Sequence, residues 1–316
     1  MPHQYWSLLG GVAPVFIIIA AGFAIRRLGW LTAEADKSLV RLTINLLYPC
    51  LIFDSVIGNA ALNNLGGVLL PPAIGIASIL IGLAVCAAAA RLLPLDARQA
   101  RTFAFSTGIQ NYGYLPVPLV QKFFGRPEIG VLFTFNLGVE IAFWTAGIYV
   151  LTLPSARTSA WKRLLNPPVF AIITSLALNF CRAAEWLPAF AATPVHMLGQ
   201  SYVPVALLLT GASLADLLSQ NHPRAPGVAS LAGCVCRLLV LPAMLLLVAK
   251  FLPCPAELKR IIVVQAAMPA AMLSLVLAKH YGGDPDTAMQ AVLSTTAVGL
   301  LTIPFWIELG LRFAGV

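Results

Sequence analysis

The chain is patterned as long apolar runs separated by short polar connections. Each run is about 20 residues long, the length with which an α-helix crosses the hydrocarbon core of a bilayer. The pattern predicts an all-α membrane protein of about ten transmembrane helices, with no soluble domain in any connection. The predicted spans lie near 4–25, 38–58, 66–90, 100–121, 128–152, 167–183, 197–218, 227–250, 258–279 and 287–312.

The composition agrees with a lipid environment. Of the residues, 59% are hydrophobic and 10% are charged, whereas a soluble domain carries roughly 25% charged residues. The Lys and Arg residues lie at the ends of apolar runs, so the net charge of +8 does not indicate a nucleic-acid partner. We predict the lipid bilayer as partner and the cell inner membrane as location. The six cysteines form no CxxC pair and the four histidines have no ligand spacing, so no metal or cofactor is expected.

The distribution of positive charge predicts the orientation. In the first half of the chain, odd-numbered connections hold ten Lys and Arg residues and even-numbered connections hold two. The positive-inside rule therefore places the odd connections in the cytoplasm and both termini on the periplasmic, outer side. In the second half, Lys250, Lys259 and Arg260 favour the opposite arrangement. We give the first half precedence because it usually dominates.

The second half of the chain repeats features of the first at a nearly constant offset. The segment Ala13–Ile19 matches Pro167–Ile173 at an offset of 154, and Pro118 matches Pro269 at an offset of 151. Any one of these matches could arise by chance, but a nearly constant offset of half the chain is hard to obtain by accident.

The repeat predicts two five-helix halves, residues 1–153 and 164–316. Because five is odd, the second half must enter the membrane from the opposite side. Such an inverted repeat is a frequent design of secondary transporters, in which the two parts can rock to give alternating access. A duplicated scaffold without transport is the alternative.

Helix-breaking residues interrupt the fourth and ninth spans. Proline removes a hydrogen bond from the helix ladder, and the half-helix that follows begins with unpaired amides and a partial positive charge. Interrupted spans at matching positions of two halves indicate a binding site, and two such ends favour an anion. A simple kink is the alternative for each proline alone. The candidate substrate-binding residues here are Asn111, Tyr112, Tyr114, Pro118, Gln265 and Pro269.

Four further polar residues lie inside predicted spans. Glu140 is a candidate for proton coupling, because an acid within the membrane is costly; a structural acid tied to Asn136 is an equal alternative. Arg237 could bind a substrate carboxylate with two hydrogen bonds, or could reach an interface as a snorkelling residue. Asn45 and Tyr48 could face the cavity from the second span, with plain packing as the alternative.

The chain resembles the auxin efflux carrier family, in its short bacterial form, over nearly its whole length. The resemblance rests on Leu46–Phe53, Asn111–Leu119, Asn166–Pro168 and the segment around Pro269. It implies scaffold helices 1, 2, 6 and 7, transport helices 3–5 and 8–10, and helices 4 and 9 that cross at Pro118 and Pro269. It also assigns a functional role to Asn111. Bacterial relatives are associated with malate and malonate, and plant relatives with export of an indole carboxylate. A long central hydrophilic loop, found in many plant members, is missing here.

Together these features predict a carrier of small organic anions, mono- or dicarboxylates, which works by alternating access and allows a homodimer. The site would lie between the broken helices 4 and 9. Two alternatives are a sodium-coupled carrier similar to bile-acid symporters and an exporter of aromatic carboxylates similar to auxin carriers. A membrane enzyme is disfavoured because no HExxH, GxSxG or paired-carboxylate motif occurs. A channel is disfavoured because no filter or charge ring is seen.

Overall fold

The computed structural model describes residues 2–113, 115–152, 166–220 and 227–316. The described residues form helices and no strand, apart from one antiparallel pairing between Gln110 and Ala270. The helices of the first half are α1 (Pro2–Arg27), α2 (Ala33–Leu42), α3 (Tyr48–Val56), α4 (Leu65–Ala90), α5 (Ala97–Gly108), α6 (Pro116–Phe123), α7 (Arg126–Ala142) and α8 (Ile148–Thr152). Those of the second half are α10 (Pro167–Phe180), α11 (Ala183–Trp186), α12 (Ala189–Gln220), α13 (Val228–Val235), α14 (Leu241–Phe251), α15 (Ala256–Ala267), α16 (Leu273–His280) and α17 (Pro285–Ala314).

Six helical stretches among the described residues are long and apolar enough to cross a bilayer, so the chain is a multi-pass membrane protein. The remaining predicted ranges contain α1, the 14-residue helix α10 and the two interrupted pairs α5–α6 and α15–α16. That all ten ranges cross the membrane, and that the halves are inverted, stay predictions. The six stretches are Glu34–Val56, Leu65–Ala90, Arg126–Thr152, Ala189–Asp216, Val228–Phe251 and Pro285–Ala314.

Three of these stretches contain a π-helical turn: Thr43–Leu47, Phe143–Gly147 and Cys236–Val240. In the third, Pro242 follows the turn, and a proline deprives the carbonyl four residues earlier of its helical donor. That carbonyl belongs to Leu238, and it accepts a hydrogen bond of 2.7 Å from the indole Nε1 of Trp306. The wider turn is therefore stabilised by a side chain from α17.

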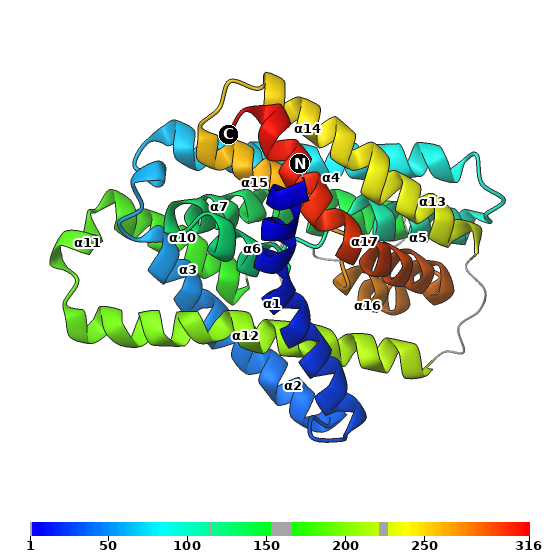
Figure 1. The fold of residues 1–316 in the computed structure, drawn as a ribbon, viewed down its shortest axis with the longest axis horizontal. Helices are drawn as coiled ribbons and strands as arrows, with labels where there is room; N and C mark the ends of the chain where they lie inside the picture. The colour runs from blue at the N-terminus through cyan, green and yellow to red at the C-terminus, as the bar shows by residue number, and fades with distance from the viewer. Residues whose placement is uncertain (1, 114, 153–165, 221–226) are drawn as a thin grey trace.

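One group of helices is built around the long helix α12, which α1 crosses (Figure 1). Gly22 in α1 and Gly211 in α12 allow the two backbones to touch, since a methyl group at either position would collide with the other helix. Helix α3 packs on α12, and α10 packs on α3. Arg26 lies 2.9 Å from both Asp36 and Asp216, and these ion pairs fix the C-terminal end of α1 to its neighbours.

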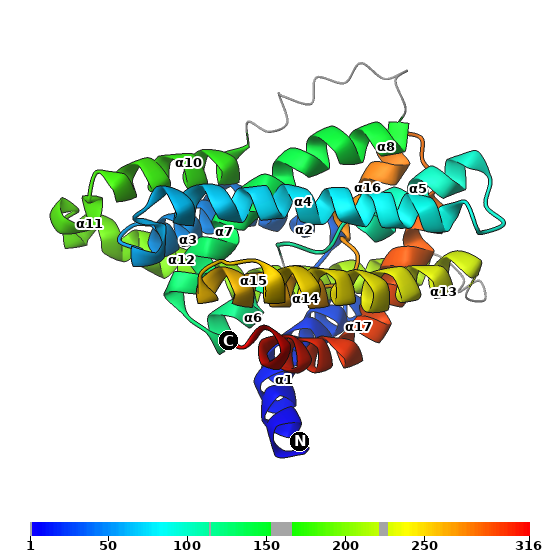
Figure 2. The same ribbon diagram turned by 90° about the horizontal axis from the view of Figure 1, so that it is seen from above.

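The second group consists of α4 to α8 and α13 to α17. Helix α4 runs along the length of the molecule (Figure 2), and it contacts both α7 and α14. Helix α17 packs against α13, α15 and α5, so segments from both halves of the chain share this group. The two interrupted helices lie inside it, which places the interruptions at the centre of the molecule.

Candidate functional site

The two interruptions meet and pair through their backbones. Helix α5 ends at Gly108 and α6 begins at Pro116, while α15 ends at Ala267 and α16 begins at Leu273. The Asn111 amide donates to the Pro269 carbonyl at 2.8 Å, and the Ala271 amide donates to the Ile109 carbonyl at 3.0 Å. These bonds satisfy backbone groups that the interruption takes out of the helix. The predicted approach of the two broken helices is therefore present.

The proline assignment needs a correction. Pro269 lies in the interruption between α15 and α16, but Pro118 lies in the first turn of α6 and is buried there. A proline is tolerated in the first turn because its missing amide hydrogen would have no helical partner in any case. The fourth span is thus interrupted before its prolines. Tyr114, the remaining candidate of this segment, lies outside the described residues.

Behind the crossing lies a chain of amides. Gln265 is 1% exposed, and its Nε2 donates to Oδ1 of Asn136 at 3.0 Å. Asn136 in turn donates through Nδ2 to the Tyr112 carbonyl at 2.8 Å. Gln265 therefore supports the interrupted segment through Asn136 and does not line the cavity described below.

Arg237 also lies behind the crossing. It is 1% exposed, and its Nε donates to the Met268 carbonyl at 3.0 Å, where α15 ends. The C-terminal end of a helix carries partial negative charge, so a guanidinium is favourable there. Arg237 reaches no interface, and it does not line the cavity. Asn45 is exposed within its π-helical turn and does not line the cavity either, whereas the adjacent Ile44 does.

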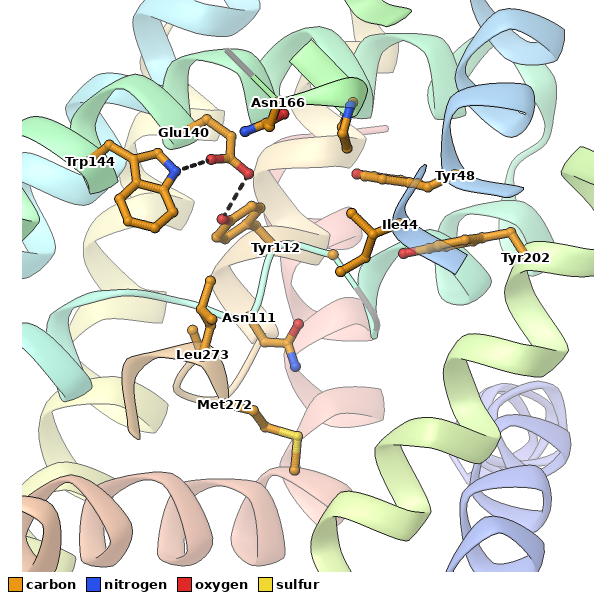
Figure 3. Close-up of a pocket in the computed structure, with 13 residues that line it drawn as sticks. Ile44, Tyr48, Asn111, Tyr112, Glu140, Trp144, Asn166, Tyr202, Met272 and Leu273 are labelled. Carbon is orange, nitrogen blue, oxygen red and sulfur yellow. Dashed lines mark hydrogen bonds between the residues drawn. The ribbon is translucent and has the colours of Figure 1, made fainter. Parts of the chain in front are cut away.

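A cavity of about 210 Å³ opens beside the crossing (Figure 3). This volume is below the roughly 300–1,000 Å³ of pockets for drug-sized ligands, so it suits a small metabolite. Four of the lining residues are aromatic, one is acidic, and none of the described ones carries a positive charge. The cavity is lined by Ile44, Tyr48, Asn111, Tyr112, Gly113, Glu140, Trp144, Asn166, Pro168, Tyr202, Ala271, Met272 and Leu273.

Glu140 is held by two aromatic donors. Its Oε1 accepts a hydrogen bond of 3.0 Å from the Tyr112 hydroxyl, and its Oε2 accepts one of 2.7 Å from the Trp144 Nε1 (Figure 3). The expected tie to Asn136 is wrong, because both polar ends of Asn136 are used at the crossing. The carboxylate is thus oriented at the cavity wall. Its role in proton coupling stays a prediction.

Asn111 contributes both backbone and side chain. Its amide holds the crossing, and its side chain lines the cavity although the residue is only 4% exposed. Within the described part of the chain, the side-chain amide makes no hydrogen bond, so a donor and an acceptor are available to a ligand. Figure 3 shows Asn111 and Glu140 on either side of Tyr112.

Sequence reasoning missed several lining residues. Trp144 lies one helical turn after Glu140, so its spacing could have indicated the contact. Tyr202 stacks on Tyr48 with ring centroids 4.7 Å apart, and no feature of the sequence joins these two residues. Met272 and Leu273 line the cavity because α16 begins there, after the interruption.

Comparison with known proteins identifies relatives over the whole chain. A family model described as "Membrane transport protein" matches residues 7–160 and 151–307. An uncharacterized transporter of Methanothermobacter thermautotrophicus is 26% identical over 300 residues, which are 93% of this chain and 96% of the relative. One of Methanocaldococcus jannaschii is 24% identical over 92% of this chain and 95% of the relative. Auxin efflux carrier component 1 of Arabidopsis thaliana is 27% identical over 160 residues, covering 48% of this chain and 25% of the plant protein.

Proposed function

Because the chain belongs to the membrane transport protein family, of the auxin efflux carrier type, we propose that it is a secondary carrier that moves small organic anions across the bilayer by alternating access. The carboxylate of the substrate binds at the crossing of the two interrupted helices. The observation that carries this proposal is the nearly buried side-chain amide of Asn111, which faces a cavity and has no hydrogen bond within the described residues.

The start of α16 supports anion binding at this place. Met272 and Leu273 line the cavity, and Leu273 is the first residue of the helix. The amides of Ser274 and Leu275 already donate to the Ala271 and Met272 carbonyls, which leaves the amides of Met272 and Leu273 for a ligand at this partially positive helix end. A carboxylate between Asn111 and the start of α16 would accept hydrogen bonds from a side chain and from the backbone together.

The location of the cavity supports alternating access. Ile44, Tyr48 and Tyr202 belong to stretches that pack with the α12 group, whereas Asn111 and Met272 belong to the interrupted helices of the second group. A bound molecule would therefore touch both groups. Movement of one group against the other would open the cavity first to one side and then to the other.

A first test compares Asn111→Ala with Asn45→Ala in proteoliposome uptake and in ligand-induced thermal shift with a panel of organic acids. A hydrogen bond to a charged group is worth about 1.5–3 kcal/mol, so Asn111→Ala should weaken binding roughly tenfold to hundredfold. Asn45→Ala removes the same group from an exposed position outside the cavity and should transport normally. Equal uptake by both variants would remove Asn111 from the site.

An exporter of aromatic carboxylates is a second candidate, because the cavity wall contains Tyr48, Tyr112, Trp144 and Tyr202. Aromatic rings offer large apolar contact area and favour offset or edge-on partners. If this candidate is correct, aromatic acids in the same panel should compete with, and bind more tightly than, aliphatic acids of equal charge.

A further inference from the structure

The cavity has an acidic end. Glu140 is the one acidic residue among the described lining residues, and each of its oxygens accepts a hydrogen bond from the cavity wall. The indole Nε1 of Trp144 can only donate, so Oε2 is held as an acceptor. Tyr112 and Trp144 therefore set the orientation of this carboxyl group at the cavity wall.

In its ionised form, a carboxyl group held in this way selects against a substrate that is only anionic. Two negative charges repel each other strongly where water is scarce, so a dicarboxylate fits this cavity poorly. A positively charged amino group fits well, because it pairs with the carboxylate and is attracted by aromatic π-systems. The four aromatic residues of the wall, among them Tyr48 and Tyr202, provide such systems.

The end of the cavity that suits a carboxylate lies on the other side of Tyr112 from Glu140. There the Asn111 amide and the start of α16 form the end suited to a carboxylate, as argued above, and Figure 3 shows that Tyr112 separates this end from Glu140. A single small cavity of about 210 Å³ therefore presents an anion-binding end and a cation-binding end. A molecule that matches both ends carries a carboxylate and an ammonium group.

We propose that the transported molecule is a zwitterion, a small amino acid whose ammonium group binds Glu140 and whose carboxylate binds Asn111 and the start of α16. The inference rests on the proposed carrier function and keeps its carboxylate site, but it replaces the plain organic anion by a molecule that also carries an ammonium group. The remaining wall is apolar or aromatic, formed by residues such as Ile44, Met272 and Leu273. The side chain of the amino acid is therefore aliphatic or aromatic rather than charged.

Matched compounds test the two ends separately. One set is phenylalanine, 3-phenylpropanoate and 2-phenylethylamine, and the other is leucine, 4-methylpentanoate and 3-methylbutylamine. Within each set, the compounds differ only in which charged group is present. Binding to the purified full-length protein is measured by calorimetry and thermal shift. The wild-type protein should bind the amino acid at least tenfold more tightly than either partial compound.

Variants assign the discrimination to Glu140. Glu140→Gln should bind the plain acid as tightly as, or more tightly than, the amino acid, because the repelling charge is gone. Glu140→Asp keeps the carboxyl group and should retain the preference for the amino acid. If the glutamine variant fails to fold, the aspartate variant still tests the role of this carboxyl group. Glu34→Gln changes an exposed acid in the first turn of α2 and should behave as wild type.

The outcomes separate the two proposals. If the wild-type protein binds plain acids as tightly as amino acids, the zwitterion inference is overturned and the organic-anion carrier stands. If only the amines bind, both proposals are wrong. If none of the compounds binds at millimolar concentration, or if Glu140→Gln keeps the amino-acid preference, the inference is likewise overturned.

Discussion

At the scale of single residues, Arg237 illustrates how a charge can serve the interior of a membrane protein. Its Nε caps the Met268 carbonyl at the C-terminal end of α15, and the residue does not line the cavity. We expect Arg237→Met to lower the free energy of unfolding by about 1.5–3 kcal/mol, because it leaves that carbonyl without its charged donor. Thermal unfolding should show a clear decrease in Tm, with ligand affinity unchanged. Arg237→Lys keeps the charge and should lower the free energy of unfolding by a smaller amount. A stable Arg237→Met protein that no longer binds ligand would instead make Arg237 a substrate ligand.

The sequence predicted which residues are unusual better than it predicted where their side chains lie. Asn111, Tyr112 and Glu140 were identified from their positions in apolar spans, and they do meet at one cavity. Gln265 and Arg237 were expected there for the same reason, but they support the crossing from behind. Spacing along one helix cannot decide this, because the direction of a side chain toward the cavity depends on helices that are distant in sequence.

At the scale of helices, close approach of backbones holds the crossing in place. Gly82 in α4 lies against the carbonyl of Gly108, the last residue of α5, so a methyl group at Gly82 would collide with that carbonyl. Gly82→Ala should therefore destabilise the protein by about 1–3 kcal/mol or more, the usual cost of overpacking. The methyl group added by Gly66→Ala in the same helix would contact only the Asn64 side chain, at 3.3 Å. Since alanine favours a helix over glycine by about 1 kcal/mol, this control should be neutral or stabilising. Equal Tm values for the two variants would contradict the packing argument.

The interruptions could be predicted from sequence, but their extent could not. Proline and glycine in an apolar run predict a broken helix, and Pro269 lies in such a break. The first break precedes Pro116 rather than surrounding Pro118, because the backbone between Ile109 and Asn111 is stabilised by pairing with the other interrupted segment. That pairing is a tertiary contact between residues about half the chain apart, so neither segment reveals it alone. The π-helical turn at Cys236–Val240 likewise depends on Trp306 from another helix.

At the scale of the whole molecule, polar contacts join the two groups of helices. Arg126 at the start of α7 donates to the backbone carbonyls of Asp54 and Ile57 at the end of α3. One contact between two side chains is the pair Gln121 in α6 and Gln200 in α12, where Nε2 donates to Oε1 at 2.8 Å. Another polar pair, Asp54 in α3 and His196 in α12 at 3.1 Å, lies inside the α12 group. If the groups move against each other during transport, the first pair must separate in the cycle, whereas the second pair keeps its distance.

This difference gives a direct test of alternating access. Gln121→Cys with Gln200→Cys, joined by a short bifunctional thiol reagent in a background without the six native cysteines, should abolish uptake into proteoliposomes. The linked pair holds the groups in one arrangement, so the cavity can open to one side only. Asp54→Cys with His196→Cys, joined in the same way, should retain uptake. Full transport by the linked Gln121 and Gln200 positions would show that these helices do not separate, and the boundary between moving and fixed parts would then have to lie elsewhere in the bundle.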